Sequence, residues 1–175
     1  MWNEQPMNKD YEDNLFEQEI GQKTEQISTP FLLGVELKVH RGGRICYGML
    51  IARVQPHNGP DIVKISIAFT HQNTIKYKDS FLLNEEYVYK GLPKEYLEKV
   101  SSSVCETITA KNVYPQCHIL FEYAANCEVG SSPMIFGIIA EIITNLICTS
   151  SLDEIHNISI DSFTEKYARN IGLCY

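Results

Sequence analysis

The sequence predicts an α+β fold, a mainly antiparallel sheet of four to five strands with two helices on one face. Three observations support this prediction. Apolar and polar residues alternate in several segments of the first half of the chain, which is typical of half-buried strands. The second half contains two helical patterns, and a further strand pattern lies between them. A capped, nearly all-apolar run at 131–148 is the clearest helical signal.

The first two strands are predicted to form a hairpin. In residues 35–39, Val, Leu and Val alternate with Glu and Lys, and a longer strand pattern follows at 45–54. Gly42 and Gly43 lie between them and suit a tight turn. Arg44 beside these glycines suggests a phosphate site, but a hairpin turn explains the same residues and is the favoured interpretation.

A third strand is predicted at 63–69, where apolar and polar residues again alternate. The polar stretch at 70–84 is interpreted as an excursion or a longer hairpin. Residues 85–90 contain two tyrosines and a valine, and we expect them to pair back as a strand.

The first helix is predicted after Gly91-Leu92-Pro93, which breaks the preceding strand. Its core face consists of apolar residues at steps of three, four and four: Leu97, Val100, Val104 and Ile108. A strand is predicted after Pro115, with Cys117, Ile119 and Phe121 on one face.

The second helix is predicted to begin at Pro133 with Ser132 as its N-cap. The run from 134 to 148 is too short and too polar to span a bilayer. Four residues interrupt it at intervals that predict one narrow polar stripe. They are Gly137, Glu141, Thr144 and Asn145. A partly buried Glu141 with a shifted pKa is one interpretation, and a place on the exposed stripe is the favoured one.

The domain proper is predicted at 31–150. Residues 1–30 are polar and predict a flexible or partly helical arm, with a short helix near 11–27 and disorder in the first ten residues. Residues 151–175 predict a helical extension that begins with a capping box at Ser162 and Glu165.

Composition limits the function classes. The chain has 175 residues and a net charge of −7, which argues against a strong general attraction to nucleic acid. The first residues lack a basic start and an apolar core, so no signal peptide is expected and the predicted localisation is cytoplasmic. The six cysteines form no C-x-x-C pair, and free thiols are expected.

No catalytic, nucleotide or metal motif is found. The P-loop, G-x-G-x-x-G, H-E-x-x-H and G-x-S-x-G patterns do not occur, and the five histidines have no ligand spacing. Ser131 and Ser132 suggest a nucleophile pair, but a helix cap explains both. We therefore expect a protein that is not an enzyme and has no cofactor and no metal.

The order of these motifs resembles the fourth domain of elongation factor G, which is also found in the tetracycline ribosomal-protection proteins. The resemblance covers roughly residues 34–148, with an expanded segment near 70–84. It rests on the hairpin VELKVHRGGRICYG at 35–48, on LPKEY at 92–96, on the strand at 117–121 and on VGSSPMIF at 129–136.

This resemblance implies a β-α-β unit with a left-handed crossover, which is an exception to the usual hand. In the parent factors the loop tips of this domain enter the ribosomal decoding region, and a separate domain binds GTP. The GTPase motifs are not present here, so no nucleotide is expected. By position, the resemblance gives these RNA-contact candidates: Arg41, Gly42, Gly43, Arg44, Asn126 and Cys127.

Two functions are therefore expected. The first is a non-catalytic module that associates with the ribosome or with RNA through the hairpin. The alternative is a structural or protein-interaction domain that forms a homo-oligomer, as the acidic charge, the added arm and the amphipathic C-terminal segment suggest. No membrane association is expected.

Overall fold

The computed structural model describes residues 14–21, 24–27, 29–41, 43–57, 62–71, 75–78 and 87–148. The disorder expected for the first ten residues and the helix expected in the 151–175 extension lie outside the described residues.

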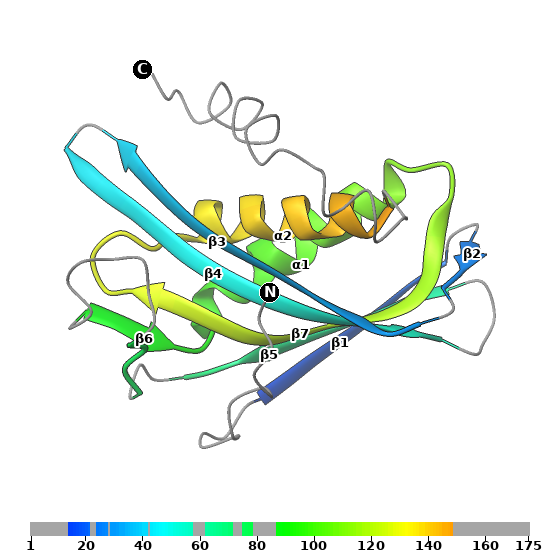
Figure 1. Cartoon of the computed structure of the whole chain (residues 1–175), viewed down its shortest axis with the longest axis horizontal. Helices are drawn as coiled ribbons and strands as arrows, with labels where there is room; N and C mark the ends of the chain where they lie inside the picture. The colour runs from blue at the N-terminus through cyan, green and yellow to red at the C-terminus, as the bar shows by residue number, and fades with distance from the viewer. Residues whose placement is uncertain are drawn as a thin grey trace.

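A twisted sheet forms the main layer, and five of its strands lie in the order β1-β5-β7-β4-β3 (Figure 1). These strands are β1 (Asn14–Gly21), β3 (Phe31–Arg41), β4 (Arg44–Pro56), β5 (Ile62–Phe69) and β7 (Tyr114–Cys127). Two short strands, β2 (Thr24–Gln26) and β6 (Val88–Lys90), also pair with β7. All pairs are antiparallel except β5–β7 and β2–β7. The predicted mainly antiparallel α+β class is confirmed.

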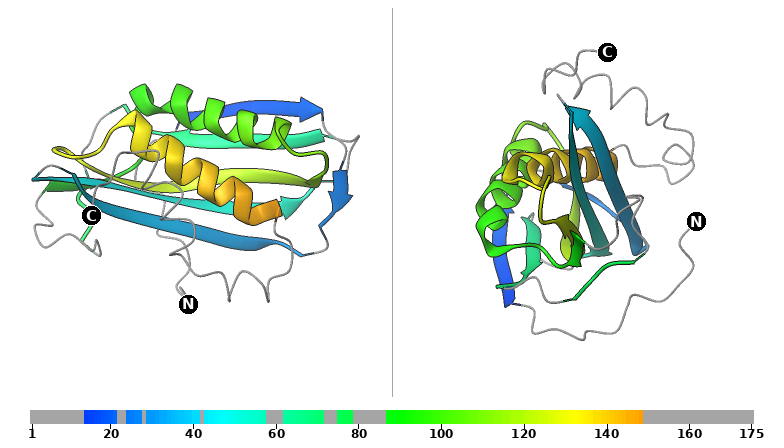
Figure 2. Two further views of the ribbon diagram at one scale, coloured as in Figure 1. Left: turned by 90° about the horizontal axis from the view of Figure 1, so that it is seen from above. Right: turned by 90° about the vertical axis from the view of Figure 1, so that its left-hand side faces the viewer.

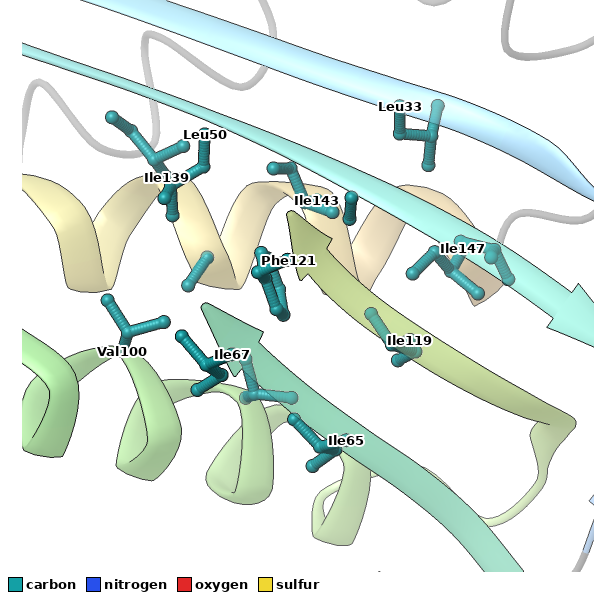
Figure 3. Packing of buried hydrophobic residues seen from close by; sticks show 14 of the residues in the cluster. Leu33, Leu50, Ile65, Ile67, Val100, Ile119, Phe121, Ile139, Ile143 and Ile147 are labelled. Carbon is teal, nitrogen blue, oxygen red and sulfur yellow. The ribbon is translucent and has the colours of Figure 1, made fainter. Parts of the chain in front are cut away.

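Two helices cover one face of this sheet, as predicted (Figure 2). They are α1 (Leu97–Thr109), which follows a 3-10 turn at Lys94–Tyr96, and α2 (Pro133–Cys148). The predicted stripe of α1 is buried, because Val100, Val104 and Ile108 are fully covered. These side chains pack with alternate residues of the central strands, among them Ile67 and Phe121 (Figure 3). Removing this apolar surface from water stabilises the layer.

The helix α1 connects the parallel neighbours β5 and β7, and so forms the β-α-β unit. The left hand of this crossover stays a prediction. Within the 70–84 region, the described residues 75–78 pair with β6 as in a longer hairpin, because the Tyr77 amide donates to the Val88 carbonyl over 2.9 Å. Tyr77 and Val88 bury Tyr47 and Met49 in a second apolar cluster. Since Met49 alternates with Leu50 of the main core, this cluster lies on the sheet face opposite the helices.

The helix expected near 11–27 is wrong, because residues 14–21 form the strand β1. This strand pairs antiparallel with β5, with Phe16 opposite Ile67 and Ile20 opposite Val63. Phe16 and Ile20 are four residues apart, a spacing that fits one face of a helix and also one face of a strand. The exposed edge of β5 decides the outcome, because a strand there satisfies its backbone groups. The strand β1 is part of the sheet rather than of a separate arm.

The polar stripe expected on α2 is also partly wrong. Gly137 packs against α1, and a Cβ there would lie 2.9 Å from the Ser103 hydroxyl. Thr144 is fully buried and its hydroxyl donates to the Ala140 carbonyl over 2.7 Å. Glu141 is half-buried rather than exposed. A glycine can be buried at low cost, and so can a hydroxyl that bonds within its own helix. Gly137 and Thr144 are therefore buried, and Gly137 lies in the contact between α2 and α1 rather than on an exposed stripe.

Candidate functional site at one end of the sheet

The β3–β4 hairpin and the turn between β7 and α2 lie at the same end of the molecule (Figures 1 and 2). In the hairpin, Arg41 pairs with Arg44 and Gly43 has φ +80°. The Tyr47 amide of β4 donates to the Gly130 carbonyl of the turn over 3.2 Å. We call the tip the residues 40–41, 43–47, 87–90 and 127–134, which meet at this end.

Ser131 fixes the turn of the tip to β4. Its hydroxyl donates to the Tyr47 carbonyl over 2.7 Å and accepts from the Cys127 amide over 2.7 Å. Gly130 has φ +144°, and a Cβ on it would collide with the Ile45 carbonyl oxygen. Only glycine fits this backbone conformation and this close approach. The turn is therefore attached to both β4 and β7.

The two serines have different roles. Ser132 caps α2, because its hydroxyl accepts from the Ile135 amide over 3.4 Å, and Pro133 is the first residue of the helix. This part of the prediction is confirmed. The expectation that a helix cap explains both serines is wrong for Ser131, which joins β4 to the turn. Its neighbours in sequence gave no sign of this contact because Tyr47 is 84 residues away.

The structure separates the RNA-contact candidates into two groups. Gly43 and Arg44 are exposed at the hairpin, and Arg41 ends β3 beside them. Gly42 lies outside the described residues.

Asn126 and Cys127 are buried, so the expectation that they face RNA is wrong. The Asn126 side-chain amide donates to the Gly91 carbonyl over 2.9 Å, and Cys127 belongs to the second apolar cluster. The physical reason is that β7 continues to Cys127, well past the predicted segment, and pairs there with β6. The exposed residues of the turn are Glu128 and Val129.

Four large apolar side chains at the tip are exposed to solvent. Their exposed fractions are 38% for Ile45, 48% for Tyr87, 78% for Val129 and 54% for Met134. The backbone places Tyr87 next to the turn that carries Val129, since the Glu128 amide donates to the Tyr87 carbonyl over 3.0 Å, and Gly130 of the same turn lies against the Ile45 carbonyl. We call these four residues the apolar patch. Sequence reasoning missed it, because a strand pattern or an apolar helix pattern does not tell which apolar residue lies at an end.

Charge is also concentrated at this end. The tip half comprises the described residues of 36–47, 68–78, 87–99 and 124–137, and carries eight Lys or Arg against four Glu. The remaining described residues carry three Lys or Arg against six Glu. The eight are Lys38, Arg41, Arg44, Lys76, Lys78, Lys90, Lys94 and Lys99.

The described part of the chain is therefore not acidic. It carries eleven Lys or Arg and ten Glu, a net +1, so the residues outside it carry the remaining −8 of the total −7. Three of those carboxylates, Asp79, Glu85 and Glu86, lie in sequence between segments of the tip half. The excess of eight cations over four carboxylates therefore applies to the described residues of the tip half.

A polar cluster lies away from the tip, on the sheet face opposite the helices, around β1 and β5. Glu17 pairs with Lys64 over 2.7 Å, and Ser66 donates to Glu17 over 3.2 Å. The Ser66 hydroxyl and His118 Nε2 share a hydrogen bond of 2.7 Å. The hydrogen bond from Lys64 lowers the pKa of the Glu17 carboxyl, and burial lowers the pKa of the His118 imidazole. The spacing of the histidines in the sequence did not predict this cluster, because its residues lie on three different strands and only strand pairing brings them together.

This cluster is built to hold β1 rather than to activate a nucleophile. Ser66 has one proton and Glu17 can only accept, so the three groups are satisfied when His118 donates to Ser66. In that arrangement the imidazole does not take the serine proton, and Ser66 is fully buried. A buried hydroxyl whose proton points to a surface carboxylate cannot reach a substrate.

Other chemistry is limited in the described ranges. No group of three or more His, Cys, Asp and Glu side chains that could hold a metal ion occurs among these residues. Four of the cysteines there form no disulfide: Cys46, Cys105, Cys117 and Cys127. None of the helices in this part of the chain has the length and apolar character needed to cross a membrane.

No protein-family model matches the chain, and no curated protein matches it. Among solved structures, the chain is similar to the crystal structure of ttk003000868 from Thermus thermophilus. The two share 14% sequence identity with a TM-score of 0.46, and the match covers 76% of this chain and 17% of that chain. This is a remote structural resemblance.

Proposed function

We propose that this domain is a non-catalytic module that binds RNA, including the RNA of the ribosome, through its tip. The observation that carries the proposal is the uneven charge, with eight cationic and four anionic side chains in the described tip half. Nucleic-acid affinity arises largely from cations that meet phosphates, so the tip is the end that an RNA would meet. The resemblance of the hairpin and of the 129–136 motif to a translation-factor domain also supports the tip as the RNA-binding end.

The hairpin geometry also supports the proposal. Arg44 is exposed beside Gly43, and Arg41 pairs with Arg44 at the last position of the hairpin ladder. An exposed arginine at the start of β4 suits contact with a phosphate. The turn is carried by two long paired strands, β3 of eleven residues and β4 of thirteen.

Binding of the full chain to purified ribosomes and to ribosomal RNA, measured from 50 to 300 mM KCl, tests this proposal. We expect affinity to fall with salt, and Arg44→Gln to weaken binding and to reduce the slope of log K against log salt by about 0.7 to 0.9. Lys111→Gln, just after the far end of α1, removes the same charge and should leave binding unchanged. Undetectable binding at 50 mM, or equal losses in the two variants, would contradict the proposal.

A homo-oligomer is the second candidate function. It is favoured by β3, an end strand of eleven residues whose Leu32 is 46% exposed. An end strand of this length offers a backbone edge to a second copy. Light scattering at several protein concentrations tests it, and a strict monomer throughout would exclude it.

A further inference from the structure

The apolar patch at the tip is not explained by phosphate binding. Ile45, Tyr87, Val129 and Met134 are exposed at the same end of the domain as the hairpin, although apolar side chains gain nothing from contact with phosphates. Their backbone positions are fixed, since Ser131 and Gly130 bind the turn to β4 and Ser132 caps the helix that carries Met134. These four apolar side chains are therefore exposed on a fixed backbone, at the end of the domain where the described residues carry more cations than carboxylates.

We propose that the tip selects RNA whose bases are unstacked, as in single strands and loops, over regular duplex RNA. This inference rests on the proposed function and adds the class of RNA. Unpaired bases offer flat faces that stack on aromatic and apolar side chains, while a duplex offers mainly phosphates and sugars. Tyr87, Val129 and Met134 contact bases, and Arg44 contacts the phosphates of the same strand.

The position of Tyr87 supports a stacking role. It directly precedes β6 and its carbonyl accepts from the Glu128 amide over 3.0 Å, so its backbone is fixed next to Val129 while its ring is half exposed. An exposed ring on a fixed backbone loses little freedom on binding a base. Lys90 of the same short strand and Lys94 before α1 add positive charge nearby. A protein partner for the patch would not require this concentration of cations.

Fluorescence anisotropy with the full chain tests the inference. The probes are a labelled twelve-nucleotide RNA without internal pairing and the duplex of the same strand with its complement, at 50 to 200 mM KCl. We expect tighter binding to the single strand. Tyr87→Ala should weaken single-strand binding by about tenfold, as expected for the loss of one stacked base, and leave duplex binding unchanged.

Matched variants keep the two proposals separate. Tyr87→Phe keeps the ring and should retain single-strand affinity, and Val129→Ser should weaken it. Lys111→Gln, just after the far end of α1, should have no effect on either RNA. Arg44→Gln should weaken both RNAs.

The outcomes divide as follows. Equal affinity for both RNAs, with Tyr87→Ala and Val129→Ser without effect, overturns this inference and leaves the proposed function standing. Undetectable binding of both RNAs at 50 mM KCl rejects the proposed function as well. Conversion of an oligomer to a monomer by Val129→Ser, with RNA binding unchanged, shows that a second copy covers the patch and also overturns the inference.

Discussion

The turn at the tip and the strand β1 are both attached to the central sheet, but they are attached by different chemistry. The turn is held by a serine hydroxyl, by backbone groups and by a glycine without a side chain. The strand β1 is held by backbone pairing with β5 and by its Glu17 side chain, which pairs with Lys64 and accepts from Ser66. Ser66 shares a further hydrogen bond with the titrating His118 of β7. Contacts between neutral groups do not change with pH, whereas contacts between titrating groups do. The tip should keep its shape under conditions that loosen β1.

The largest expected effect comes from adding a methyl group to the turn. Gly130→Ala introduces a Cβ that collides with the Ile45 carbonyl oxygen at φ +144°, so the turn must move away from β4. We expect a loss of about 3 kcal/mol in the free energy of unfolding. Urea denaturation measures it, with Gly21→Ala as the control, because a Cβ there meets nothing within 4 Å. Equal stability of the two variants would show that the turn is not fixed by β4.

A smaller effect is expected from removing one hydroxyl. Ser131→Ala leaves the Tyr47 carbonyl and the Cys127 amide without their bonds to that hydroxyl, at a cost of about 2 kcal/mol. The same denaturation experiment measures it. Ser102→Ala is the control, since its exposed hydroxyl donates to the Lys99 carbonyl of its own helix. If both variants lose the same small amount, Ser131 does not hold the turn.

The pH response should distinguish the two regions directly. Burial lowers the pKa of folded His118 below its ordinary 6.5, so the stability from its neutral form is complete above about pH 6.5 and is lost as pH falls through the folded pKa. The pKa of Glu17 is also lowered, and its contribution is lost below about pH 4.5 in the same direction.

Hydrogen exchange at pH 7.5 and pH 5.5 checks this difference. After correction for the intrinsic pH dependence, β1 amides should lose protection at the lower pH while amides of the tip turn keep theirs. His118→Gln, which still donates a hydrogen bond but does not titrate, should reduce the change in β1. Loss of protection in both regions to the same extent would contradict the comparison.

The smallest effect is expected at the other side of β1. The Ser101 hydroxyl of α1 donates to the Gln18 side chain over 2.8 Å, and Ser101→Ala removes this bond. We expect a loss of about 0.5 to 1 kcal/mol, seen as faster exchange in β1 with the rest of the sheet unchanged. Because β1 depends on several weak contacts, each one should matter little alone. A loss of the whole strand in this variant would show that one contact dominates.

The periodic signals could be recognised from the sequence, and the long-range pairings could not. The stripe of Val100, Val104 and Ile108 and the cap at Ser132 are local patterns, and both are confirmed. The strand at 14–21 was missed because its two core residues fit a helical spacing equally well, and the free edge of β5 decided the matter. The exposure of Tyr87 and Val129 depends on where strands end, which alternation does not specify.

The uneven charge has a kinetic consequence as well. With a net +4 in the described tip half and −3 in the remaining described residues, this part of the domain is an electric dipole aligned with its strands. An anionic partner would turn such a domain before touching it, with the tip leading, at separations comparable to the screening length of about 8 Å at physiological salt. A larger fraction of encounters would then begin at the tip. Added salt would lower the association rate before it lowered the stability of the complex.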